Sequence, residues 1–528
     1  MKRALLIACL AFSASALFSQ TTFQRLYGFG TVTMLYDINT TGNGGYVVCG
    51  STGASSTDAL VAGLDANGIP QWSRHFGSWM GNEEAYSCHP TPSGSYFMLG
   101  YSDSYSLNGE INAIVTSPNG NVTANKSYQD NNGLLYPFAG ACSGNGDLVS
   151  GGTYTDLNTS YSFIHVERAS ASGQQIWEKS FSAGQVASNS EGQDLIVDAS
   201  GNVIVVGISY STSNEIFLAR LDATTGNISL LRQYIVSGGY ANYMTVDCTA
   251  DGGYIIATRY VDSITGDYFI LLLKLDQNGN VQWSNIYSAN NISTAFSKSL
   301  APKVKQTSDH SYVVSSYLME VATSIYYPNL ILFDSTGNFV SAKYYTLTSS
   351  IGFWGSKPRL TSDGGYIAAF NAADSAFSTA FGHVVKTDAA LATGCFETAF
   401  SLNRQGISFA VDSGFTTTAI VNETVHELGN TGISLNYSDN CDINVGLNEY
   451  LPADHVSISP NPSGGIFLIT GKENIASIHV YNLTGQEVLS CAVDDIQATI
   501  DLSDRSKGIY LVRIASSAGS FTVKVIIE

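Results

Sequence analysis

The feature that most constrains this chain is a segment of about 50 residues that recurs along most of its length. Each copy has a glycine-rich turn followed by a run of Tyr, Val and Ile, most clearly at residues 251–256 and 363–367. Glycine supplies the positive φ of the turn, and the following residues favour a half-buried strand. These strands start at Tyr46, Tyr96, Leu148, Val203, Tyr254, Tyr312 and Tyr366. Four copies have glycine four residues later, which we interpret as room for close packing of neighbouring sheets: Gly50, Gly100, Gly152 and Gly207.

A second anchor follows in six copies, where an apolar strand ends in a turn glycine and an aromatic residue stands eight positions beyond it. The turn glycines are Gly68, Gly120, Gly173, Gly226, Gly279 and Gly337, and the aromatic residues are Phe76, Tyr128, Phe181, Tyr234, Tyr287 and Tyr345. Trp72, Trp177 and Trp283 stand four residues before three of these aromatics, on the same strand face. A fixed offset of this kind indicates a structural repeat.

Each copy therefore contains a first strand, the Tyr strand, an apolar strand and an aromatic strand, which is typical of a β-propeller blade rather than of a solenoid. The seventh copy lacks its aromatic strand, because Leu402 occupies the expected position after Gly394. Residues Phe23–Gly28 resemble residues 72–77 and can supply it. We predict an all-β chain with a seven-bladed propeller over residues 20–394, closed by its N-terminal strand so that no sheet edge stays open.

The chain begins with a predicted signal peptide over residues 1–19. Lys2 and Arg3 precede an apolar stretch, and cleavage after Ala16 or Ser19 fits the small residues found there. No later apolar run approaches the ~20 residues of a membrane helix. The chain has 24 Lys and Arg against 43 Asp and Glu, a net charge of −19. Such a charge makes nucleic acid and anionic membrane surfaces poor partners.

After the propeller we predict a β-rich connecting segment over residues 395–446, a linker over 447–455 and a small β-sandwich over 456–528. Apolar residues alternate there between Pro- and Gly-containing turns. The motif residues are Pro460, Asn461, Pro462, Gly485, Gly508 and Tyr510. This stretch resembles the type A C-terminal sorting domain of type IX secretion cargo. The resemblance implies handling by the type IX secretion machinery and delivery to the outer cell surface or the medium after periplasmic transit.

Seven cysteines remain after the signal peptide. Cys49, Cys88, Cys142, Cys248 and Cys491 lie in or beside apolar strands and are interpreted as free thiols that pack as small apolar groups. Cys395 and Cys441 flank the connecting segment outside the repeats. We predict a disulfide between these two residues.

No catalytic motif stands out. Asp precedes the turn glycine in five repeats (Asp65, Asp222, Asp276, Asp334 and Asp388), which indicates an Asx-stabilised turn rather than a calcium loop. Glu83 and Glu84 are adjacent, so in a strand they would face opposite sides, and we interpret them as solvated loop residues. The scattered histidines and cysteines show no zinc spacing, and no cofactor is predicted.

Aromatic residues instead gather in loops that a meander places on one face of the ring. The predicted ligand-binding residues are Tyr101, Tyr154, Tyr210, Tyr260, Tyr327 and Trp354, with Trp79, Tyr136, Tyr240 and Tyr243 on the blade connections of the same face. Exposed aromatics suit sugar rings or protein partners, although ordinary Tyr packing within loops explains the pattern as well. Two functions follow as hypotheses: a binding or adhesion module for glycan or protein, or an extracellular carbohydrate-active hydrolase or lyase.

Overall fold

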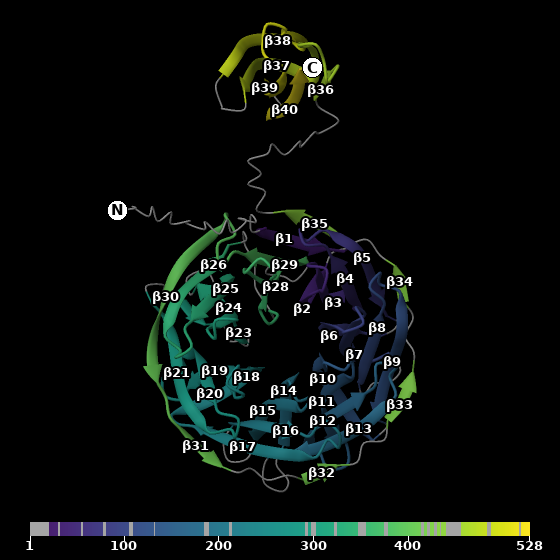
Figure 1. Ribbon diagram of the computed structural model, residues 1–528, viewed down its shortest axis with the longest axis vertical. Helices are drawn as coiled ribbons and strands as arrows, with labels where there is room; N and C mark the ends of the chain where they lie inside the picture. Colours follow the sequence, from purple (N-terminus) through teal and green to yellow (C-terminus); the bar gives the residue numbers. More distant parts are fainter. Residues whose placement is uncertain are drawn as a thin grey trace, which may run out of the picture. The chain divides into compact units, whose positions relative to one another are not determined.

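The chain forms two compact units, residues 1–441 and 442–528, each of which has its own core (Figure 1). The structure is a computed structural model. It describes residues 21–29, 32–53, 56–77, 81–104, 109–130, 132–183, 189–210, 214–290, 294–296, 302–320, 325–346, 355–373, 379–412, 417–419, 423–426, 430–432, 435–439, 456–482, 487–516 and 519–527. The predicted signal peptide lies outside these residues.

The first unit is a seven-bladed β-propeller whose blades form a ring (Figure 1). Cavities lined by its innermost strands form a central channel. The strands nearest the channel are β2 (Thr33–Thr40), β6 (Glu83–Pro90), β10 (Gly133–Cys142), β14 (Asn189–Val197), β18 (Gly239–Cys248), β23 (Lys303–Gln306) and β27 (Arg359–Leu360). The Tyr strands come next as β3 (Tyr46–Thr52), β7 (Tyr96–Ser102), β11 (Leu148–Asp156), β15 (Val203–Tyr210), β19 (Tyr254–Asp262), β24 (Tyr312–Glu320) and β28 (Tyr366–Ala373). A short strand, β22 (Thr294–Phe296), also pairs with β24.

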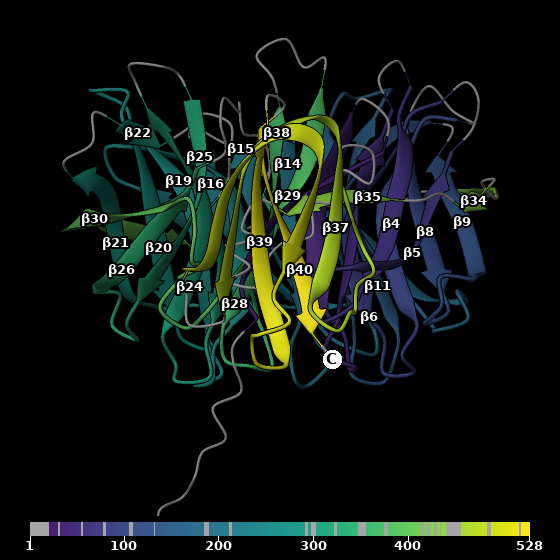
Figure 2. The ribbon, with the colours of Figure 1, turned by 90° about the horizontal axis from the view of Figure 1, so that it is seen from above.

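The apolar and aromatic strands complete the outer half of each blade. The apolar strands are β4 (Asp58–Leu64), β8 (Glu110–Thr116), β12 (Ser162–Ala169), β16 (Asn214–Leu221), β20 (Tyr268–Leu275), β25 (Ile325–Phe333) and β29 (Ala380–Thr387). The aromatic strands are β5 (Pro70–Phe76), β9 (Val122–Asp130), β13 (Gln175–Ser182), β17 (Ile228–Val236), β21 (Val281–Asn290), β26 (Phe339–Tyr345) and β1 (Phe23–Gly28). Figure 2 shows these strands running between the two faces of the ring.

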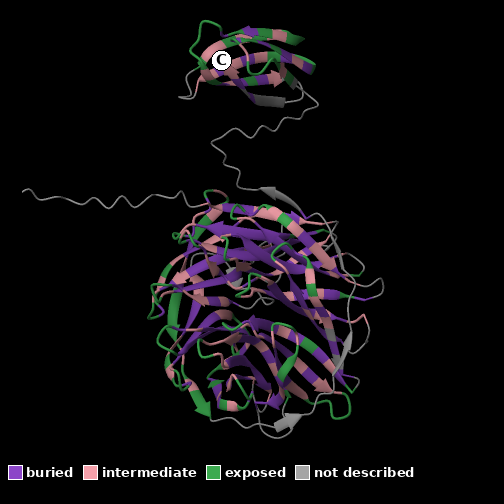
Figure 3. Cartoon of the chain, turned by 45° about the vertical axis from the view of Figure 1, so that its right-hand side comes forward, coloured by how far each residue is buried: buried purple, intermediate pink, exposed green. Residues whose placement is uncertain are grey.

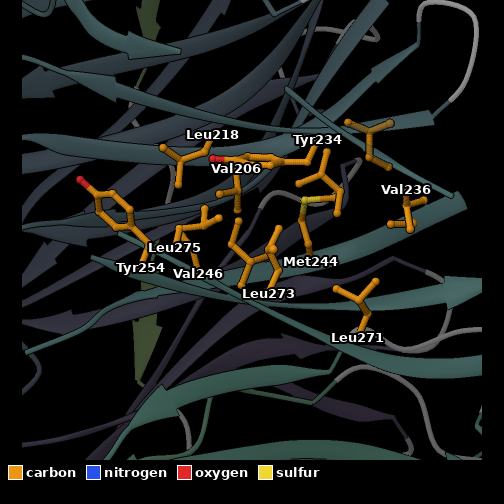
Figure 4. Packing of buried hydrophobic residues seen from close by; sticks show 14 of the residues in the cluster. Val206, Leu218, Tyr234, Val236, Met244, Val246, Tyr254, Leu271, Leu273 and Leu275 are labelled. Atoms are coloured by element: carbon orange, nitrogen blue, oxygen red, sulfur yellow. The ribbon is translucent and has the colours of Figure 1, made fainter. Parts of the chain in front are cut away.

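The hydrophobic core lies between neighbouring blades, and for that reason the Tyr and apolar strands are apolar on both faces. β3 is buried at every position, and Figure 3 shows the same continuous burial along the middle strands. Between the fourth and fifth blades, Val206, Leu218 and Tyr234 pack against Met244 and Leu273 (Figure 4). A strand covered on both sides needs large β-branched and aromatic residues at successive positions, which this sequence supplies.

The ring closes through its N-terminal strand. β1 pairs antiparallel with β29, with Arg25 opposite Val384, and takes the place of the aromatic strand that the seventh repeat lacks. This is the pairing that the sequence pattern predicts. The first and last parts of the propeller repeats are thereby joined in one blade.

Aromatic residues of the outer strands attach six of the blades to the next one. Four tyrosine hydroxyls donate to turn carbonyl oxygens of the following blade: Tyr27 to Gly68 at 2.6 Å, Tyr234 to Gly279 at 2.8 Å, Tyr287 to Gly337 at 2.6 Å and Tyr345 to Leu391 at 3.0 Å. The indole N–H groups of Trp72 and Trp177 donate in the same way to Pro118 and Ala223, both at 3.0 Å. Buried hydrogen bonds such as those of the four tyrosines contribute about 1 kcal/mol each.

Residues 397–439 form a belt of short strands around the outside of the propeller, visible as the green arrows at the rim in Figure 1. The belt strands are β30 (Glu397–Gly406), β31 (Phe409–Asp412), β32 (Thr417–Ala419), β33 (Glu423–His426), β34 (Asn430–Gly432) and β35 (Asn436–Asp439). β30 pairs with both β21 and β26, so the fifth and sixth blades share one sheet. The later strands pair in turn with β17, β13, β9, β5 and β1. Every blade therefore gains an outer strand, which pairs an edge that would otherwise be open.

The belt strands lie in the segment 395–446, which the sequence pattern predicts to be a β-rich connection after the propeller. Phe400 and Leu402 are buried and join the core between the fifth and sixth blades, and Lys343 pairs with Glu397 at 2.7 Å. These residues belong to the propeller, since residues up to 441 fall in the same compact unit. The repeat pattern does not reveal this, because the belt strands have no counterpart in the other copies.

The second unit is a small β structure of five strands: β36 (Val456–Ser459), β37 (Ile466–Asn482), β38 (Glu487–Asp501), β39 (Gly508–Ser516) and β40 (Gly519–Ile527). β37 is irregular between Thr470 and Ile475. Its first half pairs with β36 and β38, and its second half with β38 and β39. Apolar side chains from both halves, among them Phe467, Ile478 and Val512, form one buried core.

Candidate functional site

The innermost strands of the first five blades each contain a β-bulge, which inserts one extra residue into the strand. The extra residues are Tyr36, Tyr86, Phe138, Gln193 and Tyr243. A bulge bends its strand and redirects a side chain, and bulges are common beside binding sites. All five of these side chains line the central channel.

Glycine in the Tyr strand accommodates the bulge in four of these blades. A Cβ atom on Gly50, Gly100 or Gly207 would lie about 2 Å from a carbonyl oxygen of the bulged strand: Met34 at 1.8 Å, Glu84 at 1.9 Å and Glu191 at 2.0 Å. At Gly152 the nearest atom would be Ile111 Cδ1, at 2.8 Å. The glycine is thus required mainly by the adjacent strand of its own blade. Our interpretation that these glycines serve packing between neighbouring sheets is corrected for Gly50, Gly100 and Gly207, whereas at Gly152 the nearest atom does belong to the neighbouring blade.

The bulges frame a funnel made of two connected cavities. The first, which we call the aromatic chamber, has a volume of about 370 Å³, and the second, the charged chamber, has a volume of about 280 Å³. The aromatic chamber is lined by Tyr36, Glu84, Tyr86, Tyr136, Pro137, Phe138, Gly192, Gln193, Tyr243, Met244, Lys303 and Gly355. The charged residues of the charged chamber are Asp37, Asp194, Asp247, Lys303, Lys305, Lys357 and Arg359. The chambers share several residues, including Tyr36, Tyr86 and Lys303, so they form one continuous hollow.

One wall of the aromatic chamber is a hydrogen-bonded group around Glu84. The side chains of Tyr36 and Tyr86 both hydrogen bond to the Glu84 carboxyl, and the two rings lie 5.5 Å apart at an angle of 52°. Burial is the largest cause of a raised pKa at Glu84, and the charge of Asp103 adds to it. Burial next to Glu84 also raises the pKa of both tyrosines well above the ordinary value. The hydroxyls therefore stay protonated and can donate.

The opposite wall presents Tyr243, whose side chain is 41% exposed and whose φ is 55°. The Arg259 guanidinium lies 4.5 Å from the centre of the Tyr243 ring. Its Nε–H donates to Asn242 Oδ1 at 2.8 Å, which fixes the position of the guanidinium. A cation behind the ring holds it in place. Gln193 is held similarly, because its Oε1 accepts from the Met244 backbone N–H at 2.9 Å.

The carboxylates of the charged chamber join blades together. Asp37 accepts from the Cys88 N–H at 3.2 Å, Asp194 from the Val246 N–H at 2.8 Å and Asp247 from the Gln306 N–H at 2.8 Å. Each also pairs with a cation: Arg359 with Asp37 at 3.2 Å, Lys357 with Asp194 at 2.6 Å and Lys305 with Asp247 at 2.9 Å. His89 lines the same chamber, and burial, reinforced by nearby Arg359 and Lys357, lowers its pKa to about 3, so it is neutral.

The tyrosines that the sequence predicts to bind ligand differ in burial and in the contacts of their rings. Tyr154 and Tyr260 are each 3% exposed, so the expectation that they form an exposed face is wrong for these two. Tyr210 donates to Glu191 at 2.9 Å and is half-buried, and the Tyr327 ring lies tilted against the Tyr344 ring, with centroids 5.2 Å apart. All four of these tyrosines lie within strands rather than in loops, in β11, β15, β19 and β25. Trp354 lies outside the described residues.

Tyr101 contacts the wall of the funnel, since its ring stacks on Tyr136 with centroids 5.5 Å apart. Tyr136 and Tyr243, which the sequence assigns to blade connections on the ligand face, do line the aromatic chamber. The interpretation of Glu83 and Glu84 as solvated loop residues is wrong. Both lie in β6, where Glu83 is fully buried and Glu84 faces the funnel. Adjacent residues of a strand point to opposite faces, which explains the difference.

The sequence contains a signal for the remaining funnel residues that the repeat anchors overlook. Tyr36, Tyr86, Phe138 and Gln193 each stand ten residues before the start of a Tyr strand. Their importance is hidden because a bulge breaks the alternation of strand residues, so their direction cannot be read from sequence spacing.

Cys395 is disulfide-bonded, whereas Cys441 lies outside the described residues, so their pairing stays a prediction. The other described cysteines, Cys49, Cys88, Cys142, Cys248 and Cys491, are free. Within the described residues no cluster of His, Cys, Asp and Glu has the geometry to hold a metal ion. The same part of the chain contains no helix of the length and apolarity needed to cross a membrane.

The sorting motif falls in the second unit. Pro460 and Pro462 follow cis peptide bonds on either side of Asn461, whose Oδ1 accepts from the Ile526 N–H at 2.9 Å. Gly508 and Tyr510 lie in β39, and the Tyr510 hydroxyl donates to the Ser506 carbonyl at 2.9 Å. Gly485 lies outside the described residues. Residues 457–528 match the family described as secretion system C-terminal sorting domain.

Solved structures with partial similarity include three enzymes. A quinohemoprotein alcohol dehydrogenase from Pseudomonas putida is 11% identical with a TM-score of 0.38, covering 68% of this chain and 76% of its own. An endo-1,5-α-L-arabinanase from Thermotoga petrophila is 11% identical with a TM-score of 0.27, covering 67% and 98%. A xylan β-1,4-xylosidase from Bacillus halodurans is 10% identical with a TM-score of 0.27, covering 72% and 99%. Similarity this low carries no argument about function. No curated protein matches the chain.

Fold and comparison together define a class: an exported protein that joins a seven-bladed β-propeller to a C-terminal sorting domain. More particularly, the sorting domain is of the type IX secretion system, so this chain is type IX cargo that is delivered to the cell surface or the medium.

Proposed function

We propose that the propeller is a binding module that holds part of a glycan in the aromatic chamber. The observation that carries this proposal is the set of five bulges that turn Tyr36, Tyr86, Phe138, Gln193 and Tyr243 into one hollow. Apolar C–H faces of a sugar ring pack on aromatic rings, while hydroxyl groups need a few fixed hydrogen-bonding partners. Gln193 and the Glu84 group supply such partners beside the rings.

Binding without catalysis is favoured by the state of the other acids in the funnel. Asp37, Asp194 and Asp247 each hold a neighbouring blade and a cation, so they are committed to the scaffold. Among the described residues, Glu84 is the one carboxyl group that lines the aromatic chamber. Two-carboxylate glycoside hydrolysis requires a second acid across the substrate.

The test is a glycan array probed with the purified mature chain, followed by calorimetry on the best ligand. Phe138→Ala should weaken binding by ~1–3 kcal/mol, which is ~5- to 150-fold in Kd, because a ring face for stacking is lost. Tyr161→Ala is the matched control, because Tyr161 is 38% exposed and does not line the funnel. Equal affinity of the Phe138→Ala chain, with an unchanged melting temperature, would contradict the proposal.

The second candidate function is a hydrolase or lyase, and the raised pKa of Glu84 is the observation that favours it. A carboxyl group whose pKa is raised by burial in a cavity is suited to act as a general acid. Mass spectrometry of the bound oligosaccharide after prolonged incubation distinguishes the two functions. Cleavage products that disappear in Glu84→Gln would identify an enzyme, and an intact ligand would identify a binder.

A further inference from the structure

Lys303 stands apart from the other cations of the funnel. Lys305, Lys357 and Arg359 each have a carboxylate partner, at 2.9, 2.6 and 3.2 Å. Lys303 has no ion-pair partner among the residues that the structure describes. The carboxylates that act most on it, Asp194 and Asp37, are already paired with other cations.

The position of Lys303 puts it within reach of a ligand. It is half-buried in β23 and is the cation that lines both the aromatic and the charged chamber. Burial lowers the pKa of Lys303, and the positive charges of Lys357 and Arg359 lower it further. An ammonium group in these surroundings is costly unless an anion joins it.

We infer that the ligand is an acidic glycan, and that Lys303 Nζ receives the anionic group of a sugar whose ring packs in the aromatic chamber. This inference rests on the proposed function. A carboxylate or sulfate ester would give Lys303 the partner that the protein does not supply, with little competition from water. A neutral sugar would occupy the same rings and leave the ammonium unpaired, so the funnel discriminates by charge.

The experiment compares matched oligosaccharides on the full mature chain. An array carries neutral galactose oligomers, galacturonate oligomers of equal length and sulfated galactose oligomers, and calorimetry follows on the best ligand. We expect binding confined to one or both acidic series, with at least ~10-fold preference over the neutral series, since charge-assisted hydrogen bonds contribute about 1.5–3 kcal/mol. Comparison of the two acidic series identifies the carboxylate or the sulfate as the recognised group.

Substitutions of Lys303 test whether this residue causes the preference for acidic oligosaccharides. Lys303→Met should remove the preference for acidic ligands, and Lys303→Arg should retain most of it. Lys126→Met is the control, because it removes one positive charge from β9 without touching the funnel.

The outcomes separate the two proposals. Equal binding of neutral and acidic oligomers by the unaltered chain would overturn the inference and leave the proposed function standing. Unchanged preference in Lys303→Met would also overturn it. Absence of binding across the whole array would overturn the proposed function, and this inference with it.

Discussion

At the scale of single residues, the bulged strands show how one missing side chain shapes the funnel. Gly100 permits the Glu84 carbonyl to approach, and this approach belongs to the bulge that turns Tyr86 inward. The same relation recurs between Gly50 and Tyr36 and between Gly207 and Gln193. The repeat thus specifies the funnel-lining residues through a backbone requirement rather than through the identity of the side chains.

Gly100→Ala tests this relation. The new Cβ would lie 1.9 Å from the Glu84 oxygen and 2.9 Å from Ala85 Cα, and both of these are backbone atoms that must move. We expect the free energy of unfolding to fall by about 1–3 kcal/mol, as for other overpacked sites. Urea denaturation measures it. Gly144→Ala is the control, because nothing lies within 4 Å of its Cβ position. Similar stability of the two variants would show that the bulge does not depend on glycine.

At the scale of elements, the propeller is held by two segments that its repeats do not contain. β1 completes the seventh blade, and the belt from β30 to β35 adds an outer strand to all blades. Because β35 pairs with β1, the belt ends on the strand that closes the ring. Closure therefore involves both the beginning of the propeller and the segment just before the sorting domain.

Removing the belt should leave the blade edges open. We expect a chain of residues 20–394 to melt at a lower temperature and to associate, since unpaired strand edges template further pairing. A chain of residues 20–446 keeps the belt and serves as the control. Size-exclusion chromatography and thermal denaturation measure both effects. A monomeric 20–394 chain with an unchanged melting temperature would show that the belt is dispensable.

At the scale of the whole molecule, the funnel and the sorting domain reside in separate units. The second unit has its own core, from Phe467 to Ile527, and matches the sorting domain over nearly its full length. The funnel lies entirely within the first unit. Neither unit needs the other for its core, so either unit can be removed without changing the core of the other.

Deleting residues 456–528 should therefore block export and preserve the propeller. In a bacterium that has type IX secretion, we expect the shortened chain to stay inside the cell envelope, as shown by immunoblots of cell and medium fractions. The melting temperature of the purified shortened chain should equal that of the propeller in the full chain. The full-length Tyr161→Ala chain is the control for export. Shortened protein at the cell surface or in the medium would contradict this assignment.

The sequence by itself determined the parts of this protein that depend on local pattern. Turn glycines and aromatics at fixed offsets indicate seven blades, the displaced strand at Phe23 indicates how the ring closes, and the motif residues around Pro460 indicate the sorting domain. Such features can be recognised from the sequence alone, because strand alternation and turn chemistry depend on residues only a few positions apart.

Only the tertiary structure decided which side chains face the channel and which segments cover the rim. Tyr154 and Tyr260 look like exposed loop aromatics in sequence, yet packing between strands buries them. Glu84 looks like a surface acid, yet the curvature of the ring brings it to Tyr36 of another blade. Likewise the belt pairs with strands hundreds of residues away through backbone groups, and backbone pairing leaves no mark on side-chain identity.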